Sequence, residues 1–273
     1  MKNKLIIGCV SILFPLSLIA QTGNTLTKEE LNKQNMELLA KAGISLADST
    51  EIIITSADTI INDKSVSKDK NSAYYAEKTK QYLLMHEEQQ KNGYINTIDP
   101  RAKELMELKY TADFHKKKYK NVFSPTSTHI RSDISQLKMA YTFVGVPNNE
   151  MDNNFGVAPF GAYKQVKNGD DSDGWDGAVQ FFNNNNIGVC AYTEHNRLLA
   201  RSGVEIIKEL TSYEINEKPT LVLIKGTNNT GFIYKLQWFD RTFTKELECA
   251  NTKFDQELKN QVIELAKRID SSN

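Results

Sequence analysis

The side chains in this sequence best suited to acid–base chemistry are a glutamate, the histidine that follows it and the aspartates of an upstream segment. Glu194 and His195 come at the end of a predicted strand, where functional side chains are often found because the strand holds them rigidly. The segment Asp170–Asp176 adds carboxylates. If these groups met, they would supply the general acid and base of a hydrolase. Sequence spacing does not show such a meeting, so a structural role for His195 is the simpler interpretation.

The same aspartates offer oxygen ligands, which makes calcium the ion to consider. An EF-hand loop needs ligands at its first, third and fifth positions and glycine at its sixth. Counting back from Gly174 places Gly169 first, and counting back from Gly177 places Gly174 third, so neither register fits. The four histidines form no HxH, HExxH or HxxxH pattern, and the sequence contains no Walker loop, GxGxxG or GxSxG. We therefore expect no metal and no cofactor.

The segment Phe155–Tyr163 (FGVAPFGAY) differs in kind, because it combines aromatic side chains with glycine in a predicted loop. Such a loop exposes apolar surface unless other residues cover it. Burial in the core is slightly favoured, and the alternative is binding of a partner or ligand. The candidate partner-binding residues are Phe155, Phe160 and Tyr163.

The first twenty residues, Met1–Ala20, have the layout of a secretory signal peptide. Two lysines precede an apolar run, and a small residue ends it. The alternatives are an uncleaved anchor, which Pro15 and the short apolar run disfavour, and lipidation at Cys9. We expect a periplasmic or secreted protein, cleaved near Ala20 and without stable membrane insertion afterwards.

Export makes the remaining cysteines informative, because an oxidising compartment favours disulfides. Without Cys9 the chain keeps Cys190 and Cys249, and the simplest prediction is a bond between them. A competing hypothesis makes Cys190 a nucleophile with His195 as its base. That hypothesis leaves Cys249 as an idle thiol in an exported protein, and no CxxC motif supports a redox site.

The residues before position 122 are predicted to be helical. Thr27–Glu30 forms a capping box before a helix that ends at Gly43. The apolar spacing from residue 53 to residue 61 favours a second helix, although the β-branched run Ile52–Thr55 would suit a strand equally well. Two longer helices, expected to pack as an antiparallel hairpin, cover Ala73–Lys91 and Arg101–Lys120.

After residue 135 the apolar pattern changes from helical to alternating. Strands are expected at Met139–Val144, Ile187–Thr193, Thr220–Ile224, Phe232–Phe239 and Phe243–Cys249. Short helices are expected at Asp176–Phe182 and Val204–Leu210. Thr252 is expected to cap an amphipathic C-terminal helix, whose apolar stripe comprises Phe254, Leu258, Val262, Leu265 and Ile269.

These elements predict an α+β fold. A helical N-terminal arm is followed by a mainly antiparallel sheet covered by helices, including the amphipathic C-terminal helix. The expected divisions are a signal peptide at residues 1–20, a helical region with its hairpin at 21–121, a linker at 122–135 and an α+β domain at 136–273.

Composition narrows the function. Basic and acidic residues number 34 each, so the formal net charge is zero, which disfavours nucleic acid as a partner. The absence of a catalytic motif favours an exported, non-enzymatic binding protein of the cell envelope or of secretion, with another envelope or secreted protein as its partner. The alternative is a secreted hydrolase of unrecognised type, with a site near His195 and the Asp170–Asp176 loop.

Overall fold

In a computed structural model of the chain, residues 51–62, 70–118, 124–164 and 173–272 are described. The predicted signal peptide, Cys9 and the capped helix after Thr27 lie outside these residues, as do Asp170, Asp171 and Ser172 of the Asp170–Asp176 loop. Of the helices in the described ranges, none is both long enough and apolar enough to cross a membrane.

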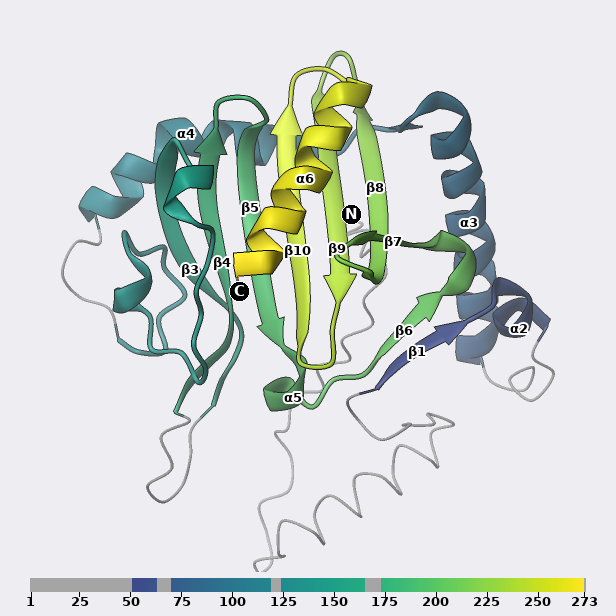
Figure 1. Cartoon of the computed structure of the whole chain (residues 1–273), viewed down its shortest axis with the longest axis horizontal. Coiled ribbons are helices and arrows are strands. Elements are labelled where there is room, and N and C mark those ends of the chain that lie inside the picture. Colours follow the sequence, from purple (N-terminus) through teal and green to yellow (C-terminus); the bar gives the residue numbers. More distant parts are fainter. Residues whose placement is uncertain (1–50, 63–69, 119–123, 165–172, 273) are drawn as a thin grey trace, which may run out of the picture.

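The described strands form one large sheet and a separate two-stranded sheet (Figure 1). In the eight-stranded sheet the order is β2-β8-β9-β10-β5-β4-β3, and β7 also pairs with β8. The sheet is mixed, because β2 runs parallel to β8 while the other neighbours are antiparallel. The small sheet joins β1 to β6 in parallel. The strands are β1 (Ile52–Thr55), β2 (Ile95–Asn96), β3 (Asn153–Lys164), β4 (Gly174–Asn184), β5 (Gly188–Asn196), β6 (Val204–Ile207), β7 (Thr211–Ile215), β8 (Lys218–Thr227), β9 (Gly231–Phe239) and β10 (Phe243–Asn251).

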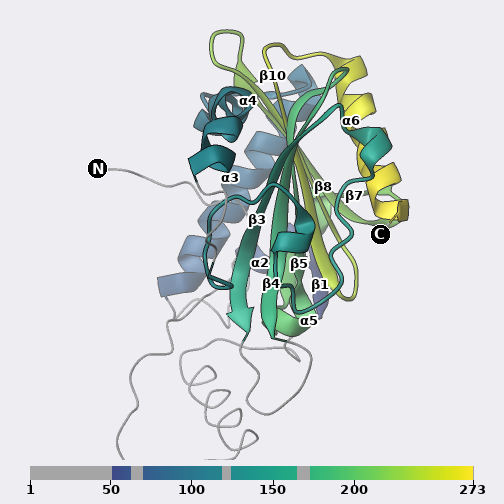
Figure 2. The same cartoon turned by 90° about the vertical axis from the view of Figure 1, so that its left-hand side faces the viewer.

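Helices occupy three places around the large sheet (Figures 1 and 2). α6 (Gln256–Ser272) crosses one face, which we call the front face, and α4 (Pro100–Lys118) lies against the opposite back face. α3 (Lys70–Asn92) stands beside the edge formed by β8. Two short helices adjoin the small sheet, since α2 (Ala57–Asn62) follows β1 and α5 (Arg197–Ala200) precedes β6.

The predicted fold class is wrong. A large mixed sheet dominates the described residues, and a helical N-terminal arm is not supported. β1 and β2 come from the N-terminal half but pair with β6 and β8 from the C-terminal half. The expected hairpin of α3 and α4 is also absent from the described structure, because the two helices pack at different places on the sheet. A sheet face offers α4 more apolar surface than a neighbouring helix would.

Two local helix predictions are wrong, and a third holds only in part. The stretches expected to be helices at Asp176–Phe182 and Val204–Leu210 belong to β4 and to β6 with a short 3-10 turn. Ile52–Thr55 is strand β1, the alternative to the helix expected over residues 53–61, and only α2 (Ala57–Asn62) is helical there. Short apolar runs fit helix and strand alike, and a pairing partner decides between them. Conversely, Met139–Val144 is not a strand, although Met139 makes a single bridge to Trp175.

The front face contains most of the core. Four residues of the predicted stripe, Leu258, Val262, Leu265 and Ile269, are buried there against the sheet, whereas the fifth, Phe254, precedes the helix and is partly buried. The helix begins later than expected, because the carboxylate of Asp255 accepts the N–H of Glu257 at 2.8 Å. The sheet residues beneath include Tyr192, Tyr234, Leu236, Trp238 and Leu247.

The back face is covered by α4 over a smaller apolar cluster. Ala102 and Leu105 are fully buried and pack with Val189, Ala191, Ile233 and Ala250. The predicted helix start is confirmed, because the N–H of Arg101 donates to Asp99 at 2.8 Å and Pro100 is the first helical residue. Arg101 also donates to Glu248 of β10 at 2.9 Å.

Helix α3 completes the edge of β8. The side chain of Gln89 donates to Val222 O at 3.0 Å and accepts from Ile224 N at 2.7 Å, as a strand peptide would.

The proposed boundary at residue 136 stays a prediction. If the segment 136–273 folds alone, it must do so without α4 and Gln89, with the back-face cluster and this edge exposed to water.

Candidate functional site

His195 meets one of the predicted aspartates. Its Nε2 atom on β5 lies 3.4 Å from Oδ1 of Asp176 on the neighbouring β4. Asp176 is only 1 % exposed, accepts the N–H of Ala162 at 2.7 Å and lies 3.3 Å from the ammonium of Lys164. Burial acts to raise the pKa of Asp176, but the interactions with His195, Ala162 and Lys164 outweigh it and hold that pKa below its ordinary value. The charged carboxylate therefore orients the imidazole.

A bulge in β3 makes room for this contact. The register between β3 and β4 shifts between Phe160 and Tyr163. Within the bulge Gly161 has φ of 77°, and a Cβ atom there would collide with Oδ1 of Asp176 and lie 3.1 Å from His195 Nε2. Position 161 thus requires glycine, both because its φ is positive and because a Cβ atom would collide with Asp176.

Glu194 does not join this pair. Successive residues of a strand point to opposite faces, and Glu194 points into the front-face core. There its carboxylate accepts the hydroxyl of Tyr192 at 2.9 Å and lies 3.9 Å from the ammonium of Lys245. Burial raises the pKa of Glu194 above its ordinary value. The structure therefore brings together His195 and Asp176 but leaves Glu194 on the other side of the sheet.

The aromatic segment Phe155–Tyr163 is an edge strand, not the predicted loop. Phe155 packs with the cluster beneath α4, and Tyr163 stacks edge-on against Trp175 with ring centroids 5.6 Å apart. Phe160 is 45 % exposed and lies edge-on to His195 at 5.4 Å. The three predicted partner-binding residues therefore do not share one exposed patch, and a contact role remains a prediction.

The predicted disulfide is confirmed. Cys190 on β5 and Cys249 on β10 are directly paired across the two strands, with Cα atoms 4.1 Å apart. Both side chains are completely buried in the front-face core. Cys190 is therefore not a free nucleophile. The bond joins two neighbouring strands of the sheet.

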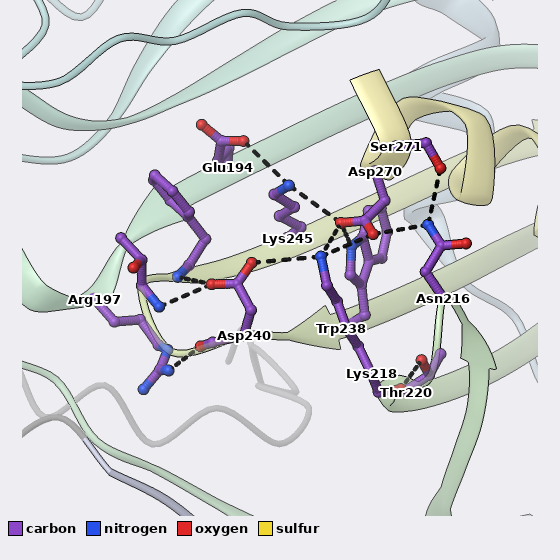
Figure 3. A network of polar contacts seen from close by, with 12 residues as sticks. Glu194, Arg197, Asn216, Lys218, Thr220, Trp238, Asp240, Lys245, Asp270 and Ser271 are labelled. Atoms are coloured by element: carbon purple, nitrogen blue, oxygen red, sulfur yellow. Dashed lines mark hydrogen bonds and ion pairs between the residues drawn. The ribbon is translucent and has the colours of Figure 1, made fainter. Parts of the chain in front are cut away.

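A buried polar network fixes the last turn of α6 (Figure 3). Asp270 accepts hydrogen bonds from Lys218 at 2.6 Å, Asn216 at 2.8 Å, Trp238 at 2.9 Å and Lys245 at 3.2 Å. Burial alone would raise the pKa of Asp270, but these hydrogen bonds and the charge of Lys245 lower it to about 2.

The network continues from Asp270 toward the lower end of β5. The ammonium of Lys218 lies 3.7 Å from the carboxylate of Asp240, whose backbone oxygen accepts a hydrogen bond from Arg197 (Figure 3). The sequence analysis missed these residues. The sequence does contain one signal of this network. Asp270 lies four residues after Ala266, on the buried side of the helix, and a carboxylate buried there requires cations beside it.

Two hollows lie along α6 and share Arg268 as a wall. One, of about 300 Å³, is at the C-terminal end of the helix, and the other, of about 260 Å³, is nearer its start. Neither is lined by His195, Asp176 or any other histidine or aspartate. The first is lined by Pro147, Asn149, Glu150, Lys267, Arg268, Ser271 and Ser272, and the second by Asn184, Asn186, Ile187, Glu257, Asn260, Gln261, Glu264 and Arg268.

No group of three or more histidine, cysteine or acidic side chains within the described ranges is arranged to hold a metal ion. In comparisons with known proteins, no family model, no curated protein and no solved structure matches the chain.

Proposed function

We propose that this chain is an exported, non-enzymatic binding protein of the cell envelope or of secretion, whose partner is another exported protein. The observation that carries the proposal is the character of the two hollows along α6. Most of the residues that line them have amide, hydroxyl or charged side chains, and neither hollow contains the histidine–carboxylate pair that catalysis would use. Such a surface can form many hydrogen bonds to a partner without transforming it.

Export is supported by the signal-peptide layout of Met1–Ala20 and by the buried Cys190–Cys249 bond. We expect the mature chain to begin near Gln21 in the periplasm or the medium. N-terminal sequencing of protein recovered from those fractions checks this expectation. Recovery of the intact N-terminus from the cytoplasm alone would contradict it.

Site-specific photo-crosslinking in the producing cells tests the binding proposal. A crosslinking residue at Gln261, which lines a hollow, or at Phe160, whose ring is exposed beside His195, should give one discrete adduct with an exported protein. The matched control is Asn228, an exposed residue in the turn between β8 and β9. Mass spectrometry identifies the adduct. Equal labelling from all three positions, or none, would contradict the proposal.

A secreted hydrolase is the second candidate, and the contact between His195 and Asp176 is the observation in its favour. In that case His195 acts as a general base oriented by the buried carboxylate. Turnover of ester, amide or glycoside substrates by the exported protein, lost in His195→Ala with an unchanged melting temperature, would favour this candidate over the first.

A further inference from the structure

The two hollows are neighbours along α6, because Arg268 lines both. We refer to the two hollows and Arg268 together as the α6 groove. Its lining runs along the helix from Glu257 to Ser272. At 1.5 Å per residue this stretch is about 22 Å long, which matches about seven residues of extended chain.

The centre of the groove holds a fixed guanidinium group. Nε and Nη2 of Arg268 donate to the two carboxylate oxygens of Glu150 at 2.7 and 2.9 Å, and Glu150 itself is almost buried. This bidentate bond sets the plane of the guanidinium. Within the described residues Nη1 of Arg268 has no hydrogen-bond acceptor, so it remains a donor for an oxygen of a bound chain.

Amide side chains supply the next contacts. Asn149, Asn186, Asn260 and Gln261 line the groove, and their side chains make no hydrogen bond within the described part of the chain. Each such amide both donates and accepts, which matches the one donor and one acceptor of a peptide unit. None of the lining residues is aromatic, so a ligand held by ring stacking is disfavoured.

The two ends of the groove differ in charge. At the C-terminal end Lys267 and Arg268 face one carboxylate, that of Glu150. At the other end lie Glu257 and Glu264; Glu264 pairs with Lys267 at 2.7 Å, and Glu257 makes no ion pair within the described residues. A complementary ligand therefore carries an acidic group near Lys267 and a basic group near Glu257.

We propose that the α6 groove binds an extended peptide segment of a partner protein, with an acidic residue toward the C-terminal end of α6 and a basic residue toward its start. This proposal rests on the proposed function as a binding protein and names the chemistry of the partner. Strands and extended segments expose the alternating backbone groups that the amide side chains can pair with.

Panning of a phage-displayed linear heptapeptide library on the mature exported protein tests this proposal. We expect enrichment of peptides with acidic and basic residues near opposite ends, and the consensus peptide is then synthesised for titration. Asn260→Arg, which fills the second hollow at an exposed position, should weaken its binding at least tenfold. Asn228→Arg, the same substitution at the exposed β8–β9 turn, should leave binding unchanged.

Charge reversal gives a second measurement, in which the informative outcome is a gain of affinity. Glu264→Lys should weaken binding of the consensus peptide, and a peptide whose basic residue is replaced by glutamate should recover affinity for this variant. Absence of enrichment, or binding that Asn260→Arg and Glu264→Lys leave unchanged, would overturn the proposal. A crosslinked partner found together with no peptide binding would overturn this inference while the proposed function stands.

Discussion

Asp270→Asn is expected to lower the free energy of unfolding by about 3–5 kcal/mol, because it removes the carboxylate closest to Lys245 and Lys218 and leaves each with a more distant partner. The side chain of Asp270 is 2 % exposed and that of Lys245 is 3 % exposed. Lys245 would retain only Glu194, at 3.9 Å. Lys218 is 28 % exposed and can turn to water, which places the loss toward the lower end of the range.

The pH dependence of stability provides an independent check on Asp270. Its pKa falls from an ordinary 3.8 to about 2 in the folded chain, a difference that corresponds to about 2 kcal/mol. Since the folded pKa is the lower one, this stabilisation is complete above about pH 5 and is lost as the pH falls through 3.8 toward 2. Urea denaturation at several pH values should show this loss in the parent chain and not in Asp270→Asn.

Glu264→Gln is the matched control for Asp270→Asn. Glu264 lies on the same helix and pairs with Lys267 at 2.7 Å, but its side chain is 56 % exposed. Exposed pairs contribute about 0–1 kcal/mol, so this variant should remain close to the parent. Equal losses in the two variants would show that the buried network does not fix α6.

Loss of the Cys190–Cys249 bond is expected to cost up to about 4 kcal/mol, the chain-entropy value for a closed loop of roughly 60 residues. The sequence separation of the two cysteines is 59. Cys190→Ser, Cys249→Ser and the double variant should lose similar stability, because each removes the same single bond. Thermal or urea unfolding of the three variants measures the losses.

Two further measurements separate the effect of losing the bond from the effect of changing the buried side chains around it. Both cysteines are fully buried, so serine also places an uncompensated hydroxyl in the core. The double alanine variant avoids that hydroxyl, and reduction of the parent with dithiothreitol leaves the packing nearly intact. If the double serine variant loses the sum of the two single losses, or if non-reducing mass spectrometry finds two free thiols, the disulfide account is wrong.

The periodicity of apolar residues was sufficient to predict the C-terminal strands and helix. The alternation from Phe232 to Phe239 and the stripe from Leu258 to Ile269 predicted β9 and α6, because each pattern is strong and longer than four residues. The cysteine count, joined with the expected export, predicted the disulfide.

The same reasoning failed where two segments far apart in sequence determine each other. Ile52–Thr55 became a strand because β6 lies beside it, about 150 residues later. β4 is a strand because β3 and β5 pair with its two edges, whereas its apolar spacing resembles that of a short buried helix. α4 found its apolar partners on the sheet and not on α3, which sequence spacing within each helix does not show.

For the candidate sites, the residue types can be seen in the sequence, but which of these side chains come into contact depends on the fold. The sequence analysis named His195, Glu194 and Asp176, and the alternation of β5 then placed Glu194 in the core and His195 beside Asp176. Asp270 and the α6 groove depend on cations and amides from strands and loops that are distant in the chain. Side-chain type is a local property, whereas the packing of a helix on a sheet sets the distances between side chains.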